Sequence, residues 1–284
     1  MKDIKKFKII PWEWDKSKGK SNKYRYSFVP TSIWEISEKN SYLQKLINDE
    51  DENREVKRTG GALGEKGYKF SEFKPSVAYR IIEYWGEEAK TVLDPFAGRY
   101  TRMVVSLYLG KSYIGFDVVK DYIDNNIRRY EDIKENFPDQ FVKLYVSDGC
   151  IMNEISDNSY DFIFTCPPYY NLEIYKESSN QLSRLKTYDD FLLKMGQTMD
   201  NSFRVLKNGS FAVFVVADWH KKGKFYCFHN DLINLGIKSG FDLYEIVINK
   251  VFSPFIAISA SQNKRFKWMG KAHEYILVFK KIGK

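Results

Sequence analysis

One stretch of the sequence indicates the fold: Thr91-Val92-Leu93-Asp94-Pro95-Phe96-Ala97-Gly98-Arg99-Tyr100-Thr101. Its first four residues are mostly apolar and end in an acid, which is typical of a short strand buried in a sheet. Ala97 and Gly98 are small enough for the backbone to come close to a ligand, and Thr101 can cap a helix that follows. A strand, a tight turn and a helix in this order predict one unit of an α/β sheet.

Further strands and helices alternate on both sides of this unit. The predicted helices are 75–85, 102–109, 122–136, 188–206 and 232–238, and the predicted strands are 91–94, 113–117, 141–146, 160–165, 211–217, 241–251 and 274–279. Nearly continuous apolar strands are typical of a parallel sheet that helices cover on both faces. The sequence therefore predicts a doubly wound, mostly parallel, seven-stranded α/β sheet. We expect residues 69–284 to form this domain and residues 1–68, which lack the alternation, to form an N-terminal extension or cap.

Composition excludes several classes of protein. The 284 residues, of which 43% are hydrophobic, are enough for one α/β domain with an extension. No apolar run reaches the length of about 20 residues that a membrane helix needs, and the Lys-rich start lacks the apolar part of a signal peptide, so we expect a cytoplasmic protein without a membrane partner. Three cysteines without CxxC spacing and three scattered histidines predict neither disulfides nor a metal site.

The net charge of +8 is concentrated near the two ends of the chain. Residues 1–25 hold nine Lys or Arg and three acids, and a second cluster consists of Lys264, Arg265, Lys267 and Lys271. Aromatic residues are interleaved with both clusters, as contact with phosphates and stacking on bases would require. Solvated surface loops remain the alternative for either cluster alone.

Polar motifs follow four of the predicted strands. In a doubly wound sheet, ligands bind beyond the carboxyl ends of the strands, which places residues 94–100, Asp117, Asp148 and 165–170 around one crevice. Asp117 can accept the two hydroxyl groups of a ribose, and Asp148 can accept an adenine amino group. Taken singly, a helix cap explains Asp117 about equally well, and an ordinary turn is the alternative for Asp148.

The sharpest motif is Thr165-Cys166-Pro167-Pro168-Tyr169-Tyr170. Two successive prolines stiffen the backbone and remove two amide donors, so the loop presents carbonyl oxygens without competing N–H groups. A stiff loop with free acceptors and a following aromatic ring fits a flat heterocycle that carries an amino group.

These motifs together resemble those of the S-adenosylmethionine-dependent DNA methyltransferases that modify cytosine N4 or adenine N6. The resemblance rests on Phe73-Lys74-Pro75, the 94–99 turn, Asp117, Cys166-Pro167-Pro168-Tyr169 and the tail from Lys271 to Phe279. It covers residues 69–280 and extends weakly or not at all to the first seventy. Within the class, the chain is most similar to phage-type methylases, which have a Cys-Pro-Pro-Tyr-Tyr motif followed by Leu-Glu-x-Tyr. In this chain the second motif is Leu172-Glu173-Ile174-Tyr175.

The resemblance implies a role for each matching residue. The catalytic loop would be Cys166, Pro167, Pro168 and Tyr169, where the Pro167 carbonyl and the Cys166 side chain hold the amine and Tyr169 stacks on a flipped base. The residues implied to bind S-adenosylmethionine are Phe73, Lys74, Pro75, Asp94, Pro95, Phe96, Ala97, Gly98, Thr101, Asp117 and Asp148. Contact with double-stranded DNA is expected from the loops 171–186 and 253–270, at Arg184, Lys186, Lys264, Arg265 and Lys267.

Two residues depart from the family's pattern. Cys166 stands where these enzymes have Asp, Asn or Ser, and a thiol is a weaker hydrogen-bond acceptor. Tyr100 stands at the place of a third glycine, where its ring either points away from the cofactor or narrows the pocket. A covalent role for Cys166 does not fit, because the enzymes that methylate cytosine at carbon 5 have a different motif around their cysteine.

Several alternatives stay open. An RNA or tRNA amino-methyltransferase would use the same chemistry, and a catalytically weak DNA-binding protein could keep the same fold. The sequence does not distinguish adenine from cytosine as the target. A homodimer, a restriction partner, and a bacterial or phage-infected cell as the setting are likewise expectations.

Overall fold

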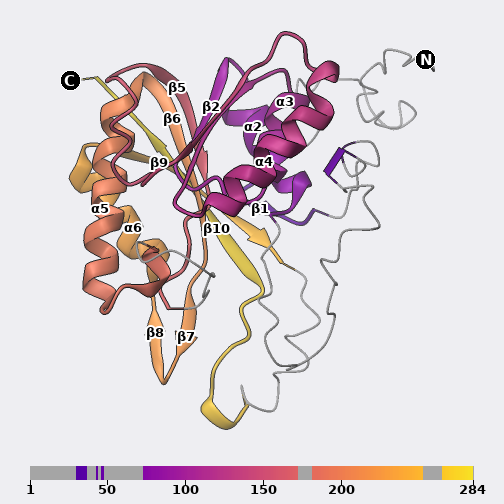
Figure 1. The fold of residues 1–284 in the computed structure, drawn as a ribbon. Coiled ribbons are helices and arrows are strands. Elements are labelled where there is room, and N and C mark those ends of the chain that lie inside the picture. The colour runs from indigo at the N-terminus through magenta and orange to yellow at the C-terminus, as the bar shows by residue number, and fades with distance from the viewer. Residues whose placement is uncertain are drawn as a thin grey trace, which may run out of the picture.

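The central sheet has eight strands. The computed structural model describes residues 30–36, 43, 46–47, 73–171, 181–251 and 264–283, and Figure 1 shows their arrangement. In spatial order the strands are β1 (Ile33–Trp34), β9 (Asp242–Lys250), β10 (His273–Lys280), β6 (Leu206–Val216), β5 (Tyr160–Thr165), β2 (Thr91–Asp94), β3 (Ser112–Asp117) and β4 (Val142–Val146).

The strand directions confirm the predicted doubly wound sheet. Strands β4, β3, β2, β5 and β6 run parallel, while β10 is antiparallel to both of its neighbours, β6 and β9. The chain moves outward from β2 to β4 and then returns to β5 on the other side of β2, so the order reverses between β2 and β5. Ligands in such sheets bind beyond the carboxyl ends of the strands at this reversal.

Helices cover both faces of the sheet (Figure 1). One face carries α2 (Pro75–Trp85), α3 (Thr101–Tyr108) and α4 (Lys120–Ile133), and the other carries α5 (Tyr188–Val205) and α6 (Phe228–Ser239). Side chains alternate along each strand, so that Val92 joins the core beneath α2 and α3 whereas Leu93 joins the core beneath α5 and α6. This burial on both faces explains why the strands are apolar throughout.

Local sequence explains where two of the helices begin. Pro75 occupies the first turn of α2, where a missing amide hydrogen costs nothing, and Val77, Ala78, Ile81 and Ile82 bury one side of that helix. Helix α5 begins with a capping box, since the Thr187 hydroxyl accepts from the Asp190 amide at 3.0 Å and the Asp190 carboxylate accepts from the Thr187 amide at 3.3 Å.

Part of the expected N-terminal extension packs into the main domain. Strand β1 runs parallel to β9, with Ile33 opposite Ile248, and adds one strand to the seven predicted. The Trp34 ring is 2% exposed and stacks on Trp85, with 5.8 Å between centroids. The described residues before position 69 therefore contribute to the core, and the boundary at residue 68 stays a prediction.

Several local features differ from the expectations. Helix α3 begins at Thr101 and not at 102, with Tyr100 at the N-cap position and no side-chain cap, so Thr101 does not cap it. Strand β6 begins at Leu206, five residues before the predicted start, because its polar residues 207–210 look like a loop. The hairpin of β7 (Trp219–Lys221) and β8 (Lys224–Tyr226) was not predicted at all. Among the described helices, none combines the length and the apolar character needed to cross a membrane.

Candidate active site

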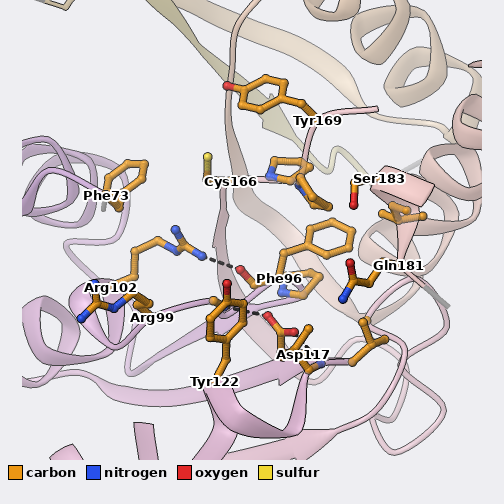
Figure 2. A pocket seen from close by; sticks show the side chains of 18 of the residues that line it. Phe73, Phe96, Arg99, Arg102, Asp117, Tyr122, Cys166, Tyr169, Gln181 and Ser183 are labelled. Atoms are coloured by element: carbon orange, nitrogen blue, oxygen red, sulfur yellow. Dashed lines mark hydrogen bonds between the residues drawn. The ribbon is translucent and has the colours of Figure 1, made fainter. Parts of the chain in front are cut away.

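A cavity of about 280 Å³ opens at the carboxyl edge of the sheet, at the reversal of strand order. The predicted site residues that line it are Phe73, Lys74, Pro95, Phe96, Gly98, Asp117, Asp148, Cys166, Pro167, Pro168 and Tyr169. In Figure 2, Asp117 and Tyr122 lie toward one end, Cys166 and Tyr169 toward the other, and Phe96 between them. The structure thus brings the turn after β2, the acid after β3 and the Pro-Pro loop into a single space.

The turn after β2 is fixed from below by Asp94, which is fully buried. Its carboxylate accepts hydrogen bonds from the Tyr113 hydroxyl at 2.7 Å, the Thr165 hydroxyl at 2.6 Å and the Phe96 amide at 3.1 Å. It also accepts from Arg102 Nε at 2.6 Å. Asp94 is therefore a positioning residue that holds the turn from behind the cavity wall.

Arg102 was not predicted, yet it lines the cavity and completes this network. Its guanidinium donates to the carbonyl oxygens of Phe96 and Ala97, which lie in the turn itself. Burial alone would lower its pKa, but the neighbouring Asp94 carboxylate raises the pKa above the ordinary arginine value, so the guanidinium stays charged. The sequence did not indicate this role, because an arginine at the start of a predicted helix is usually exposed to solvent.

Four residues proposed for cofactor contact do not line the cavity. They are Pro75, Asp94, Ala97 and Thr101, of which the last three are buried behind it. Tyr100 also lies outside the lining and is buried at 8% exposure in the core beneath α3, so its ring does not narrow the pocket.

Asp117 accepts two backbone hydrogen bonds, from Gly98 at 2.9 Å and from Val119 at 2.8 Å. Burial raises the pKa of its carboxyl to about 6, against the opposing effect of these two amides. Gly98 has φ +52°, which favours glycine, and a Cβ at Gly149 would lie 1.8 Å from the Pro95 carbonyl oxygen. The two glycines allow the backbone to close tightly around this end of the cavity.

The Pro-Pro loop is anchored by aromatic contacts. The Tyr169 ring makes edge-to-face contacts with Trp219, at 5.4 Å between centroids, and with Phe228 at 6.5 Å. Tyr170 is buried, and its hydroxyl donates to the Lys186 carbonyl at 3.1 Å. Tyr169 is therefore held in place at the cavity while Tyr170 fixes the chain behind it.

Gln181 and Ser183 line the cavity and carried no sequence signal. Both are 3% exposed, and within the described part of the chain the Gln181 amide atoms and the Ser183 hydroxyl have no hydrogen-bond partner. Buried polar groups are nearly always satisfied, so these atoms indicate a ligand that completes them. Figure 2 shows both side chains on the wall opposite Phe73.

Glu274 at the start of β10 also lines the cavity. Burial raises the pKa of its carboxyl, while a hydrogen bond from Asn249 and the charge of Lys74 lower it. This acid and Lys74 thus face the same space from β10 and from the residue before α2.

The residues predicted to contact DNA are exposed where they are described. Arg184 and Lys186 lie one and three residues after the cavity residue Ser183, and Lys264, Arg265 and Lys267 lie on a separate exposed segment. The basic cluster of residues 1–25 and the motif 172–175 lie outside the described residues.

A group of three potential metal ligands was not expected from the sequence. Asp218, Cys227 and His229 place their ligand atoms within 4.8 Å of one another, and His229 Nδ1 lies 2.8 Å from each Asp218 oxygen. Asp218 also accepts a hydrogen bond from the backbone amide of His229 in the first turn of α6, at 3.2 Å. The hydrogen bonds of Asp218 to the backbone and ring of His229 at the start of α6 therefore explain why these side chains lie together, without a metal ion.

Comparison with known proteins supports the resemblance to DNA amino-methyltransferases. A family model described as DNA methylase, of the N6 and N4 type, matches residues 2–128. The match starts at residue 2, so it also includes the first seventy residues, to which the resemblance was expected to extend weakly or not at all. It ends before the Pro-Pro loop, and the phage-type detail stays a prediction.

Two curated relatives are type II methyltransferases. M.HinfI of Haemophilus influenzae is 29% identical over 128 residues, which are 42% of this chain and 32% of the relative. M.BamHI of Bacillus amyloliquefaciens is 31% identical over 96 residues, which are 30% of this chain and 23% of the relative. The alignments therefore span a third or less of the length of these relatives.

Solved structures confirm the fold. A S-adenosylmethionine-dependent methyltransferase from Methanosarcina mazei superposes with a TM-score of 0.51 at 13% identity, covering 72% of this chain and 98% of that one. At this identity the likeness establishes the Rossmann-like methyltransferase fold alone.

Proposed function

We propose that this chain, as a relative of the DNA amino-methyltransferases, transfers a methyl group from S-adenosylmethionine to an exocyclic amino group of a base in double-stranded DNA. The observation that carries the proposal is the single cavity that joins the turn after β2, Asp117 and the Pro-Pro-Tyr loop. A cofactor and a flat base must meet within one space for a direct transfer, and this cavity offers groups suited to both.

The residues present fit the cofactor. Asp117 supplies a carboxylate at the end of β3. Burial raises the pKa of this carboxyl because the charged form loses contact with water, and hydrogen bonds from hydroxyl groups such as those of a ribose would compensate for that loss. The Gln181 amide and the Ser183 hydroxyl, which have no partner among the described residues, offer donors and an acceptor to the same ligands. Phe73, Lys74, Phe96 and Gly98 would enclose the rest. S-adenosylmethionine supplies an electrophilic methyl group when it is bound.

The Pro-Pro loop prepares the amine. The lone pair of an aromatic amine is delocalised into its ring, so the nitrogen becomes a better nucleophile when acceptors hold its hydrogens out of the ring plane. The Pro167 carbonyl is such an acceptor, on a backbone that two prolines make rigid. Tyr169 would stack on the base and fix its plane. Positioning of this kind lowers barriers by several kcal/mol, up to about 7–11 in favourable cases.

Cys166 lines the cavity directly before the prolines. Its thiol is a weak acceptor, so we assign most of the amine's hydrogen bonding to the Pro167 carbonyl. With the Pro167 carbonyl as the main acceptor, the loop can still hold the amine although position 166 is not Asp, Asn or Ser.

Labelled methyl transfer tests the proposal. Purified protein is incubated with labelled S-adenosylmethionine and either duplex DNA or tRNA, and the digested nucleosides are then separated. Label in N6-methyladenine or N4-methylcytosine of DNA supports the proposal and names the base. Label in tRNA alone would establish the RNA alternative, and binding of DNA without any transfer would establish a catalytically weak DNA-binding protein.

The names of the relatives suggest a setting. Both are type II methyltransferases, so we infer a modification enzyme that acts in the cytoplasm of a bacterial or phage-infected cell.

A further inference from the structure

The hairpin β7–β8 presents different rings on its two faces. Cross-strand pairs join Trp219 with Tyr226, His220 with Phe225, and Lys221 with Lys224. Successive pairs along a hairpin lie on opposite faces, so the Trp219–Tyr226 pair and the His220–Phe225 pair point in opposite directions.

The inner face of the hairpin is joined to the catalytic loop. Trp219 stacks on Tyr226 at 5.1 Å between centroids and contacts Tyr169 at 5.4 Å. Lys221 Nζ donates to Asn171 Oδ1 at 3.3 Å, and Asn171 is the residue directly after the Pro-Pro-Tyr-Tyr run. The position of the hairpin is thereby coupled to that of the base pocket.

The outer face forms part of a ladder of four aromatic rings, in the order Phe225, His220, Trp268 and Phe266. Neighbouring centroids are 4.8, 4.8 and 4.9 Å apart, and the last two contacts are stacked, with interplanar angles of 12° and 24°. The end rings Phe225 and Phe266 are 42% and 52% exposed. The two end side chains therefore reach solvent, where they can contact another flat ring.

The surroundings of the ladder are uniformly basic. Residues 219–226 and 264–273 contain seven Lys or Arg and no Asp or Glu. Lys271 Nζ lies 4.5 Å from the Phe225 centroid, and Arg265 Cζ lies 5.5 Å from that of Phe266. Burial, followed by the charge of Lys271, lowers the pKa of His220, so its ring is neutral at neutral pH. Rings flanked by cations fit a ligand that has flat bases and a phosphate backbone.

We propose that this ladder is a second stacking platform, which binds an unpaired base of the DNA outside the cavity. The inference rests on the proposed function for its substrate. A paired base is already stacked within the duplex, so only a base without its partner can place its face on Phe225 or Phe266. Such a base arises when the target base leaves the helix, because its former partner is then unpaired.

The test compares two duplexes of one sequence, one fully paired and one with a single unpaired 2-aminopurine. We expect wild-type protein to bind the second duplex more tightly, on the order of 5- to 100-fold, and to quench its fluorescence by stacking. The double variant Phe225→Ala/Phe266→Ala should lose both the preference and the quenching while its affinity for the paired duplex stays within about twofold. A Phe225→Leu/Phe266→Leu variant keeps apolar side chains but has no rings that can stack. Like the double alanine variant, it should lose both the preference and the quenching.

Tyr244→Ala is the matched control, because Tyr244 is 55% exposed and lies near the start of β9, which pairs with the end of β10 remote from residues 264–273. It should keep the preference. The proposal is overturned if wild-type protein binds both duplexes equally, if the double alanine variant keeps the preference, or if an RNA of the same sequence is preferred. Methyl transfer to DNA is measured in parallel, so transfer without a preference would refute the ladder alone, whereas absence of transfer would refute the proposed function.

Discussion

Arg102 Nε lies 2.6 Å from Asp94 Oδ2, and the two side chains are 6% and 0% exposed. Because Arg102 also donates to the carbonyl oxygens of Phe96 and Ala97, this buried pair fixes the turn that lines the cavity. Removal of one partner leaves the other charged in an apolar environment, which is far more costly than the loss of an exposed pair.

Asp94→Asn should therefore destabilise the fold by about 3–5 kcal/mol, since Arg102 would remain buried without its counter-charge. Denaturant unfolding measures the loss. Lys120→Ala is the control, because Lys120 and Asp124 form an exposed pair in α4 and should change stability by about 0.5 kcal/mol or less. Equal effects of the two substitutions would contradict this account.

Asp117 should make cofactor binding dependent on pH. Its carboxyl has a pKa of about 6, above the usual 3.8, so below about pH 6 it is protonated and accepts ribose hydroxyl groups less well. Binding measured by calorimetry should weaken as the pH falls through about 6. Asp117→Asn should weaken binding by roughly 10- to 100-fold at neutral pH and remove this dependence.

The same raised pKa makes the stability of the ligand-free protein depend on pH with the opposite sign, because stability decreases as the pH rises whereas cofactor binding strengthens. The folded state keeps the Asp117 proton to a higher pH than the unfolded state, so stability falls as the pH rises from about 4 to about 6. Asp117→Asn should remove that part of the decline. The exposed Asp121→Asn is the control and should leave both profiles as they are in the wild type.

Cys166→Ser should increase the rate of methyl transfer about three- to tenfold, because a hydroxyl accepts a hydrogen bond from the amine more strongly than a thiol does. Cys166→Ala should keep measurable activity, since the Pro167 carbonyl remains. Single-turnover rates with enzyme in excess separate this effect from product release. An inactive alanine variant that still binds cofactor and DNA would show that the thiol is required.

Gln181→Leu should have two effects of opposite sign. It removes a buried amide that has no partner in the described part of the chain, so the ligand-free fold should gain up to about 1 kcal/mol, while ligand binding should weaken. Ser202→Ala matches it, because the buried Ser202 hydroxyl also lacks a partner among the described residues but lies in α5, outside the cavity lining. That control should leave ligand binding unchanged, and unaltered binding in Gln181→Leu would refute the role of the amide.

Replacement of Lys264, Arg265 and Lys267 by Ala should weaken DNA binding and flatten its dependence on salt. Each lost phosphate contact reduces the slope of log K against log salt by about 0.9. Titrations at several salt concentrations give this slope. Lys238→Ala, an exposed position in the last turn of α6, should leave it unchanged. An unaltered slope in the triple variant would remove these residues from the DNA surface.

The sequence predicted best those elements whose signals are local. Pro75–Trp85, Thr91–Asp94 and Tyr160–Thr165 have the predicted bounds, since a proline at a helix start and short apolar strands need no tertiary information. Strand β1 has only two residues and pairs with β9, more than 200 residues later, so no periodicity could show it. The β7–β8 turn uses Lys222 and Gly223 at φ +48° and +81°, and lysine is not a residue typical of that conformation.

For the site, too, residues with local sequence signals could be predicted and residues that depend on tertiary contacts could not. The motifs at Asp117 and Cys166–Tyr169 could be located from strand ends alone, and they line the cavity. Arg102, Gln181 and Ser183 could not, because each matters only through its surroundings. Arg102 has a buried counter-charge, and the other two have buried atoms that find no partner among the residues the structure describes.

The pairing of Ile33 with Ile248 also has a consequence for synthesis of the chain. A ribosome makes protein from the N-terminus at about 5–20 residues per second, so β1 waits at least ten seconds or so before β9 exists. The central strands β2 and β3 are close in sequence and can pair early, whereas β1 can join the sheet only after β9 has been made. Until then Trp34 lacks the full hydrophobic site that buries it in the finished protein, which makes this segment a point where a nascent chain depends on protection from aggregation.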